Sequence, residues 1–474
     1  MESEDAHPAA VEDTPLAGYR AIALIVASGL FMENLDATVL ATAIPTMAHD
    51  FQVRVPQMSV ALTAYLLALA LFIPASGYAA DRWGARRVFR AAIALFMAGS
   101  LACAVAPNLS ILVVSRFAQG IGGAMMVPVG RLVLLRTVSK RDLVTAFSWM
   151  LIPGLLGQIS GPPIGGFIVT YLHWRWIFRI NLPIGAAGMI LVGRYIPDFR
   201  EAVQSPFDVP GFALTGIALC TGLFGLESWG HGLPLRIVGP LLATTLVFGL
   251  LYVRYARRTA RPILDLSLLS IPTFRLSFVG GSLTRITQGA QPFLLPLMMQ
   301  LAFGLSAAKS GLITVGTSLG TLTMKWLAGP ILRHLGFRIS LTLIGVLAAC
   351  SYAVCGLFRP GWPFAVIFAV LVVSGFLMSF QFTAYNTIAY DEIEPDRMSA
   401  ATSFYSTFQQ FTLSLGICVA ATALHVSTAL SRRQIPAFRD FSAAFWVVTG
   451  ISLCSYFANV RFHPQAGRQM SGAP

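Results

Sequence analysis

The chain has 474 residues, of which 56% are hydrophobic and only 11% are charged. Soluble domains carry about 25% charged residues, so this chain lacks the side chains that would cover a soluble surface. The apolar content also excludes a disordered chain, and six cysteines in apolar runs without CxxC spacing exclude a disulfide scaffold. The composition predicts a polytopic membrane protein whose net charge of +13 orients its loops rather than binding nucleic acid.

Fourteen apolar runs follow one another along the chain, each long enough to cross a bilayer as a helix. About 20 apolar residues span the hydrocarbon core in a helix, whereas barrel strands would show about 10 residues of alternating polarity. We therefore expect an all-α protein. The predicted spans are Ala21–Thr46, Gln57–Ala80, Val88–Val105, Ile111–Leu135, Leu143–Leu172, Trp174–Tyr195, Phe212–Ser228, Ile237–Tyr255, Phe274–Phe303, Ser310–Ala328, Ile339–Phe358, Phe364–Tyr390, Met398–His425 and Phe441–Val460.

Basic residues gather in alternate loops, which predicts that both termini lie in the cytoplasm. The start of the chain is acidic and lacks the basic flank of a signal peptide, so we expect a short disordered tail there. The loops expected to face inside carry Arg82, Arg86, Arg87, Arg90, Arg136, Lys140, Arg141, Arg254, Arg257, Arg258, Arg261, Arg333 and Arg338. A second group, Arg432, Arg433 and Arg439, falls in a loop expected outside, and the charge rule does not explain it.

The loop after the second span reads GYAADRWGARR over residues 77–87. It resembles the G-x-x-x-D-R-x-G-x-R-R signature of the major facilitator superfamily, although a merely basic turn is the plainer interpretation. Glycines allow a tight turn, the carboxylate can cap a neighbouring helix, and the arginines suit an anionic inner leaflet. The residues that carry this signature, and that the resemblance assigns to conformational gating, are Gly77, Asp81, Arg82, Gly84 and Arg86.

Four further stretches strengthen this resemblance. RFAQGIGGA at 116–124 is similar to the superfamily's R-x-x-Q-G-x-G-x-A, and GQISGPPIGG at 157–166 is similar to its antiporter motif. WRWIFRINLPIG at 174–185 and LDATVLATAIP at 35–45 resemble stretches of the fourteen-span drug:proton antiporters of the EmrB/QacA type. One departure is Ala41, which stands where that family has asparagine.

The resemblance implies a major facilitator fold of two six-helix bundles with two additional helices between them. The expected division is a tail at 1–17, bundles at 18–200 and 265–462, linker helices at 207–258 and a tail at 463–474. A weaker echo of the loop signature, GPILRHLG at 329–336, supports two related halves. Arg333 stands there in the place of Asp81, so the two loops differ in charge.

Ionisable residues at membrane depth are costly and are functional candidates by default. Asp36 and Glu33 lie three residues apart on one face of the first span, and Arg116 lies inside the fourth. A carboxylate that alternates between pairing with Arg116 and taking up a proton is a workable coupling device. We predict that Asp36 is the main proton carrier and that Glu33 assists it or recognises cationic substrates. The alternatives are an outer vestibule for the carboxylates and a backbone-bonding role for Arg116.

Gly157, Gly161 and Gly165 repeat every four residues in the fifth span, and Pro162 adds a bend. Small residues at this spacing let helices approach closely. The similarity to the antiporter motif implies a hinge or seal between the halves, while plain helix packing would need the same smooth surface.

Polar residues at depth are expected to face a central cavity or a neighbouring helix. The predicted substrate-cavity residues are Gln119, Gln158, Arg285, Gln288, Lys325, Gln381 and Gln409, and further polar residues are Gln291, Gln300, Asn386 and Gln410. Two cations, Arg285 and Lys325, would repel a cationic drug and attract an anion. The alternative is that they neutralise carboxylates or reach lipid headgroups.

These observations predict a proton-coupled secondary transporter that exports small amphipathic drugs or toxic compounds by alternating access. A second hypothesis is a proton-coupled transporter of one specific metabolite, an anion if Arg285 and Lys325 bind it. A structural or signalling membrane protein is the remaining alternative. No metal cluster, nucleophile–base pair, cofactor motif or phosphate loop is apparent, which disfavours an enzyme or an ATP-driven pump. The expected partners are the small-molecule substrate, protons and the bilayer, and some relatives also use a periplasmic adaptor.

Overall fold

The computed structural model describes residues 18–138, 142–197, 206–230, 232–394, 397–433 and 435–468. Lys140, Arg141, the acidic start at 1–17 and the last residues of the chain lie outside these ranges. Within them the regular structure is helical and no strand occurs. The prediction of an all-α protein is confirmed.

The first half of the chain forms six membrane-length units. Apolar runs set their lengths, and short polar or glycine-containing connections end them. The elements are α1 (Tyr19–Asp50), η1 (Val55–Met58), α2 (Ser59–Trp83), α3 (Ala85–Val105), α4 (Leu109–Thr137), α5 (Leu143–Tyr171), and the pair α6 (Trp176–Arg179) and α7 (Asn181–Tyr195), which together make one span.

Two linker helices and a second six-unit bundle follow. The linker helices are α8 (Val209–Gly230) and α9 (Leu235–Ala256). The second bundle consists of η2 (Leu266–Ser270), α10 (Pro272–Leu297), η3 (Met298–Ala302), α11 (Ala307–Cys355), α12 (Phe364–Ile388), α13 (Met398–Leu430), α14 (Phe438–Leu453) and α15 (Ser455–Asn459).

The observed helices coincide with the predicted spans. Eleven helical segments among the described residues are long and apolar enough to cross a membrane. The helices α5 and α10 add 29 and 26 residues, and α11 contains two spans separated at Gly336, where φ is 69°. Counting these together, the described residues hold fourteen membrane-length helices, as the hydropathy predicts.

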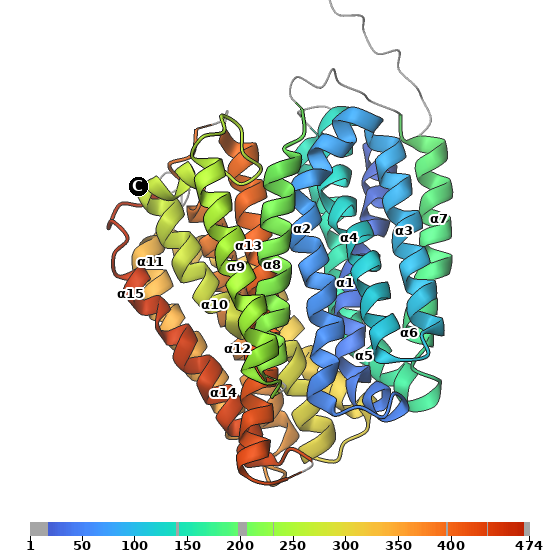
Figure 1. Cartoon of the computed structure of the whole chain (residues 1–474), viewed down its shortest axis with the longest axis vertical. Helices are drawn as coiled ribbons and strands as arrows, with labels where there is room; N and C mark the ends of the chain where they lie inside the picture. The colour runs from blue at the N-terminus through green and yellow to red at the C-terminus, as the bar shows by residue number, and fades with distance from the viewer. Residues whose placement is uncertain are drawn as a thin grey trace, which may run out of the picture.

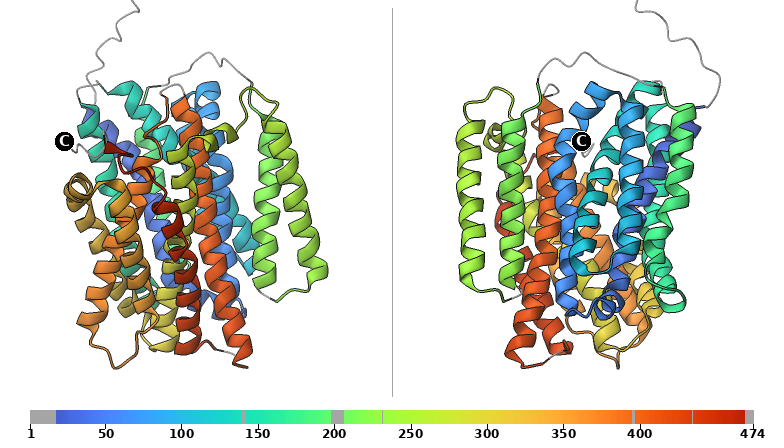
Figure 2. Two further views of the ribbon diagram at one scale, coloured as in Figure 1. Left: turned by 90° about the vertical axis from the view of Figure 1, so that its left-hand side faces the viewer. Right: turned by 45° about the vertical axis from the view of Figure 1, so that its right-hand side comes forward.

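The two bundles lie side by side, and the α8–α9 hairpin stands at their margin (Figures 1 and 2). Besides α9, α8 packs against α2 of the first bundle and α13 of the second. The start of α1 and the last described residues lie at the same end of the molecule (Figure 1). An even number of spans requires this arrangement.

The halves meet at the opposite end, where α1 ends and α11 begins. The Gln300 side chain donates to the Thr42 carbonyl at 3.0 Å, and the Ala308 amide donates to the Thr170 hydroxyl at 3.0 Å. Backbones also approach closely, since a Cβ on Gly311 would lie 2.2 Å from the Pro162 carbonyl oxygen. We call this set of contacts between the halves the closed end.

The loop signature forms a tight turn between α2 and α3. Gly84 has φ of 90°, a left-handed conformation that glycine adopts without strain. Asp81 pairs with Arg136 of α4 at 3.4 Å, and Arg86 donates to the Gly193 carbonyl of α7. Gly336 makes the equivalent turn in the second half, so the echo in the sequence corresponds to a shared backbone conformation.

The basic group near residue 433 has a partial structural explanation. Asp440 is fully buried at the start of α14 and lies 3.5 Å from the Arg433 guanidinium. It also accepts a hydrogen bond from Ser427 at 2.7 Å. Arg433 therefore neutralises a buried carboxylate, which is a reason for a cation here that a loop charge count does not contain. Nothing in the structure explains Arg432 or Arg439.

Candidate functional site

A buried ion pair occupies the core of the first bundle. Asp36 of α1 accepts a hydrogen bond on Oδ2 from Nη1 of Arg116 in α4 at 2.5 Å. Each residue is 1% exposed. The sequence places these residues 80 positions apart, and helix packing brings them together as predicted.

Two amides complete the carboxylate's environment. Oδ1 of Asp36 accepts from Gln119 Nε2 and from Asn181 Nδ2, each at 2.9 Å. Ser100 of α3 accepts from the same two nitrogens, at 2.8 and 3.3 Å. Four helices, α1, α3, α4 and α7, thus converge on one carboxylate. Such a buried charge is tolerated because both oxygens are paired and hydrogen-bonded.

The Arg116 guanidinium is enclosed on its remaining sides. It stacks 4.4 Å from the ring centroid of Tyr65, donates from Nε to the Ala61 carbonyl at 3.3 Å, and donates from Nη1 to Gln119 Oε1 at 2.7 Å. Ala61 and Tyr65 belong to α2. Arg116 therefore makes both predicted interactions. The ion pair links α4 to α1, and the hydrogen bond to the Ala61 carbonyl links α4 to α2.

Asn181 is a member of this cluster that sequence reasoning did not single out. It is fully buried and begins α7, directly after the short helix α6. The signal was present in the WRWIFRIN stretch, where an asparagine follows an apolar, aromatic run. A buried amide at a helix start needs polar partners, and Asp36 and Ser100 supply them.

Glu33 lies outside this cluster. Its carboxylate is within electrostatic reach of Arg131 and Asp36, and its Oε2 is buried without a hydrogen-bond partner among the described residues. The residue as a whole is half-buried. A second carboxylate beside the Asp36 pair is thus less fully bonded than the first.

Arg285 of α10 is a buried cation in the second bundle, 2% exposed. Its guanidinium lies 4.6 Å from the Tyr405 ring centroid and 5.7 Å from that of Phe382. Within the described part of the chain its Nε and Nη2 have no hydrogen-bond partner, and no carboxylate forms an ion pair with it. Buried donors of this kind are rarely left unpaired.

The other residues predicted for the cavity have separate locations. Gln119 belongs to the Asp36 cluster. Gln288 donates to the Met378 carbonyl at 3.2 Å, and Gln381 lies beside Gly345, inside the second bundle. Gln158 and Gln409 are half-buried, and Lys325 is exposed. Arg285 and Lys325 therefore differ in environment: the first is enclosed by aromatic rings and the second is open.

Comparison with known proteins identifies the family. The model of the Major Facilitator Superfamily matches residues 26–417 and 277–470. The chain belongs to the major facilitator superfamily. It is 37% identical over 415 residues to the probable transport protein HsrA of Haemophilus influenzae, covering 86% of this chain and 88% of that protein. It is 36% identical over 404 residues to the putative multidrug resistance protein MdtD of Pectobacterium carotovorum, covering 84% and 86%.

Solved structures of other transporters share the fold. An auto-inhibited POT family peptide transporter matches with a TM-score of 0.69 and 14% identity, over 94% of this chain and 97% of the other. A D-xylose-proton symporter matches with a TM-score of 0.66 and 15% identity, over 94% and 98%. The predicted fold class is confirmed, and the chain is a multi-pass membrane protein of a transporter family.

In this superfamily member the glycine stripe lies within one half. A Cβ on Gly161 would meet the Thr38 hydroxyl at 1.8 Å, and Gly157 and Gly165 also face α1. The next face of α5 makes the contact between halves, through Pro162 against Gly311 and through Gly166, whose Cβ would lie 2.4 Å from the Ala307 carbonyl oxygen. One helix thus presents a packing face to α1 and a separate face to α11.

Proposed function

We propose that the protein is a proton-coupled exporter of small amphipathic compounds that works by alternating access. The observation that carries the proposal is the fully buried Asp36–Arg116 pair, whose carboxylate joins α1 to α4 and α7, with Ser100 of α3 bonded to the same amides. Ionisable residues at this depth mark ion pathways in membrane proteins. The relatives named as multidrug resistance proteins support the substrate class.

The cluster supports a defined role for the proton. A proton on Oδ1 of Asp36, the oxygen that Asn181 contacts, removes the charge that holds Arg116, and the contact between α1 and α4 weakens. Arg116 keeps its bonds to Gln119 and to the Ala61 carbonyl. Asn181 Oδ1 has no donor within the described residues. Rotation of that amide would let it accept the hydrogen of the neutral carboxyl, since an amide offers a donor on one side and an acceptor on the other.

Orientation follows from the basic loops. If the arginine-rich loops face the cytoplasm of a bacterial inner membrane, both termini lie there and the closed end faces the outside. Alternating access then requires the α5–α11 and α2–α13 contacts to open. The division into bundles at 18–200 and 265–462 with linkers at 207–258 is part of this proposal, and a periplasmic adaptor remains a prediction from relatives.

A second candidate function is proton-coupled transport of an anionic metabolite. It is favoured by Arg285, which is buried and whose Nε and Nη2 have no hydrogen-bond partner among the described residues. An arginine enclosed by aromatic rings binds a planar anionic group through paired hydrogen bonds while its ring contacts persist. Exposed Lys325 would add long-range attraction without a fixed geometry.

Reconstituted vesicles with an imposed pH gradient test both candidates. Fluorescent cationic, neutral and anionic compounds of similar size are offered with the gradient intact or collapsed by a protonophore. We expect gradient-driven accumulation of amphipathic cations or neutral compounds, and of anions alone if the second candidate holds. Equal accumulation with and without the gradient for every compound moved would contradict proton coupling.

A further inference from the structure

A second buried carboxylate lies in the linker helix α8. Glu227 is 3% exposed. Its Oε1 accepts a hydrogen bond from the Ser59 hydroxyl at 2.7 Å, and its Oε2 accepts one from the Thr63 hydroxyl at 2.9 Å. Both donors belong to α2. The carboxylate thus joins the linker pair to the first bundle.

Among the described residues no cation pairs with Glu227, in contrast to Asp36. Burying an unpaired carboxylate is costly unless hydrogen bonds compensate or the group takes up a proton. Two neutral hydroxyls compensate only in part, because hydrogen bonds alone do not cancel the charge. The site therefore suits a group that changes its protonation state when its access to water changes.

Thr63 connects Glu227 to the contact between the halves. Its hydroxyl donates to Glu227, and its carbonyl accepts a hydrogen bond from Ser414 of α13 at 3.3 Å. On the same helices, a Cβ on Gly230 of α8 would lie 1.9 Å from the Thr422 hydroxyl of α13. Three helices, from the linker and from both bundles, thus meet at this carboxylate.

The hydrogen-bond pattern accommodates both protonation states. The Thr63 hydroxyl lies 2.9 Å from Glu227 and 3.2 Å from the Val60 carbonyl, so it has two acceptors within reach. If Glu227 is neutral, its own O–H donates to Thr63, which turns its hydrogen to Val60. Ser59 continues to donate to the other oxygen. No polar atom of the group is left unpaired in either state.

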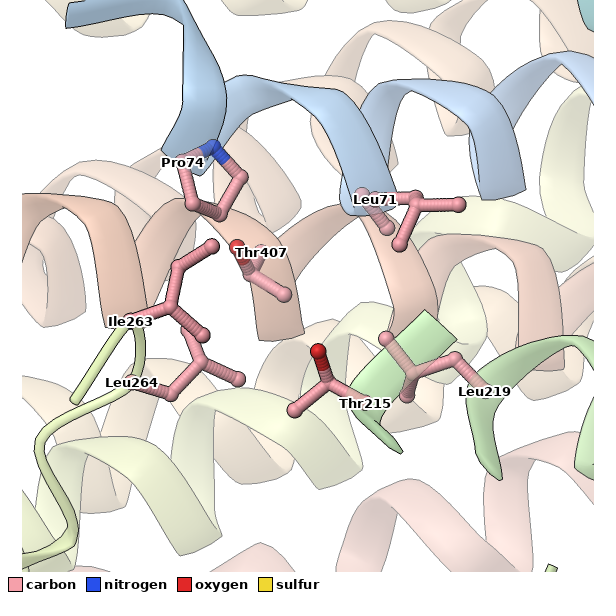
Figure 3. Close-up of a pocket in the computed structure, with 8 residues that line it drawn as sticks. Leu71, Pro74, Thr215, Leu219, Ile263, Leu264 and Thr407 are labelled. Carbon is pink, nitrogen blue, oxygen red and sulfur yellow. The ribbon is translucent and has the colours of Figure 1, made fainter. Parts of the chain in front are cut away.

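The surroundings leave one direction open to water. Towards the end of the molecule where α1 begins, Leu67, Leu223 and Cys418 form a buried apolar cluster in the seam of α2, α8 and α13. Beyond them lies a small pocket lined by apolar side chains, among them Leu71 and Leu219, and by Thr215 and Thr407 (Figure 3). α9 meets α8 through aliphatic and threonine side chains.

At the closed end the seam is polar. His425 of α13 lies beside Gly230 and is 2.8 Å from Arg54. Among the described residues, which do not include His231, the titratable or charged groups that face the Glu227 region are Cys418, His425 and Arg54. His425 is half-buried and Arg54 is exposed, so water reaches the seam from this side.

We propose that Glu227 is a second proton-binding site, which holds α8 to α2 in the conformation with a closed end and takes up a proton when α2 and α13 separate there. The linker helices then take part in the conformational cycle instead of only joining two bundles. This role rests on the proposed alternating-access transport, whereas the protonation of Glu227 can be measured without transport.

Infrared difference spectroscopy of the full-length protein in lipid vesicles measures that protonation. An acid titration should produce an infrared band of protonated carboxyl groups. The contribution of Glu227 to this band should be missing in Glu227→Gln and retained in Asp36→Asn. In the double variant Ser59→Ala/Thr63→Val the Glu227 contribution should persist to higher pH, because fewer hydrogen bonds stabilise the charged carboxylate. Spectra of Glu227→Gln that superimpose on those of the unmodified protein throughout the titration would overturn the proposal.

Transport measured against pH tests the role in the cycle. We expect Glu227→Gln to flatten the pH profile of gradient-driven transport and Thr63→Val to displace it. The matched control is Thr221→Val, which removes an α8 hydroxyl that bonds Thr245 of α9 at 2.9 Å and touches no carboxylate; its profile should be unchanged. An unaltered pH profile in Glu227→Gln would exclude the linker helices from proton coupling. A different outcome is possible: if Asp36→Asn still transports with the gradient while Glu227→Gln has an altered pH profile, Asp36 is refuted as the primary proton site and the proposal for Glu227 stands.

Discussion

The two bundles share a backbone plan and differ in their buried charges. Gly84 and Gly336 make the same kind of left-handed turn in each half. In the first half, the buried cation Arg116 is paired with Asp36 and bonded to Gln119. In the second, Arg285 is as deeply buried, but its Nε and Nη2 have no hydrogen-bond partner within the described residues, and its guanidinium lies over the Tyr405 ring.

This difference suits the two buried cations to different tasks, one to a response to protons and the other to ligand binding. Breaking a buried ion pair by removing one partner costs about 3–5 kcal/mol, so a proton on Asp36 has a large structural consequence. An unpaired guanidinium instead gains from a ligand that supplies acceptors. Under the proposed function, the first half is the place for the response to protons, and the second half is the better place for a substrate's polar group.

The largest expected effect is from Asp36→Asn. The amide keeps the shape of the carboxylate but cannot exchange a proton or pair with Arg116, so gradient-driven transport should be abolished. The protein should still insert, and this is checked by its recovery from membranes and its elution as a single species. Asp265→Asn, which removes a partly exposed partner of Arg397, serves as the control. Full gradient-driven transport by Asp36→Asn would refute the assignment to the first half.

Two glycine variants separate packing within a half from closure between halves. Gly161→Leu would drive a side chain into Thr38 of the same bundle, and Gly311→Leu would drive one into Pro162 across the closed end. We expect the first to reduce the yield of folded protein. The second should leave the yield intact while lowering transport ~5- to 150-fold, because overpacking costs about 1–3 kcal/mol. Equal loss of yield in both would show that the closed end is a fixed interface.

Arg285→Gln tests the second half. Hydrogen bonds to charged groups contribute about 1.5–3 kcal/mol, so the affinity for an anionic compound should fall ~10- to 100-fold while that for a cationic compound is kept or increased. Arg285→Lys should restore little, because lysine lacks the planar group that stacks on Tyr405. Competition between labelled and unlabelled compounds in vesicles measures both affinities. Equal changes for anions and cations would remove the anion-binding interpretation.

The smallest expected effect is from Asn181→Ala. It removes one of the three hydrogen bonds to Asp36 and leaves the Arg116 pair in place. A single hydrogen bond contributes about 1 kcal/mol, so transport should slow ~5-fold without loss of proton dependence. Initial rates at several pH values give this result. A loss as complete as that of Asp36→Asn would mean that the cluster acts as one unit.

The sequence predicted the spans well because hydropathy is a local property, and it predicted the Asp36–Arg116 pair because charges at depth need partners. It did not single out Asn181, which sits in a stretch that reads as a helix start, or Glu227, which lies next to the end of a predicted span at Ser228. Near a span end a carboxylate resembles an interfacial residue, and only the packing of α8 on α2 shows that it is buried.

Composition and apolar runs by themselves determined the membrane class and the helix count, while the resemblance of the motifs and the echo at 329–336 indicated the duplicated plan. The tertiary structure decided which polar groups meet, since Asp36 and Asn181 are 145 residues apart and Glu227 is 164 residues from Thr63. The physical reason is that burial in lipid constrains each helix separately. A buried hydrogen bond between helices, in contrast, requires their packing to bring a donor atom and an acceptor atom to about 3 Å from each other.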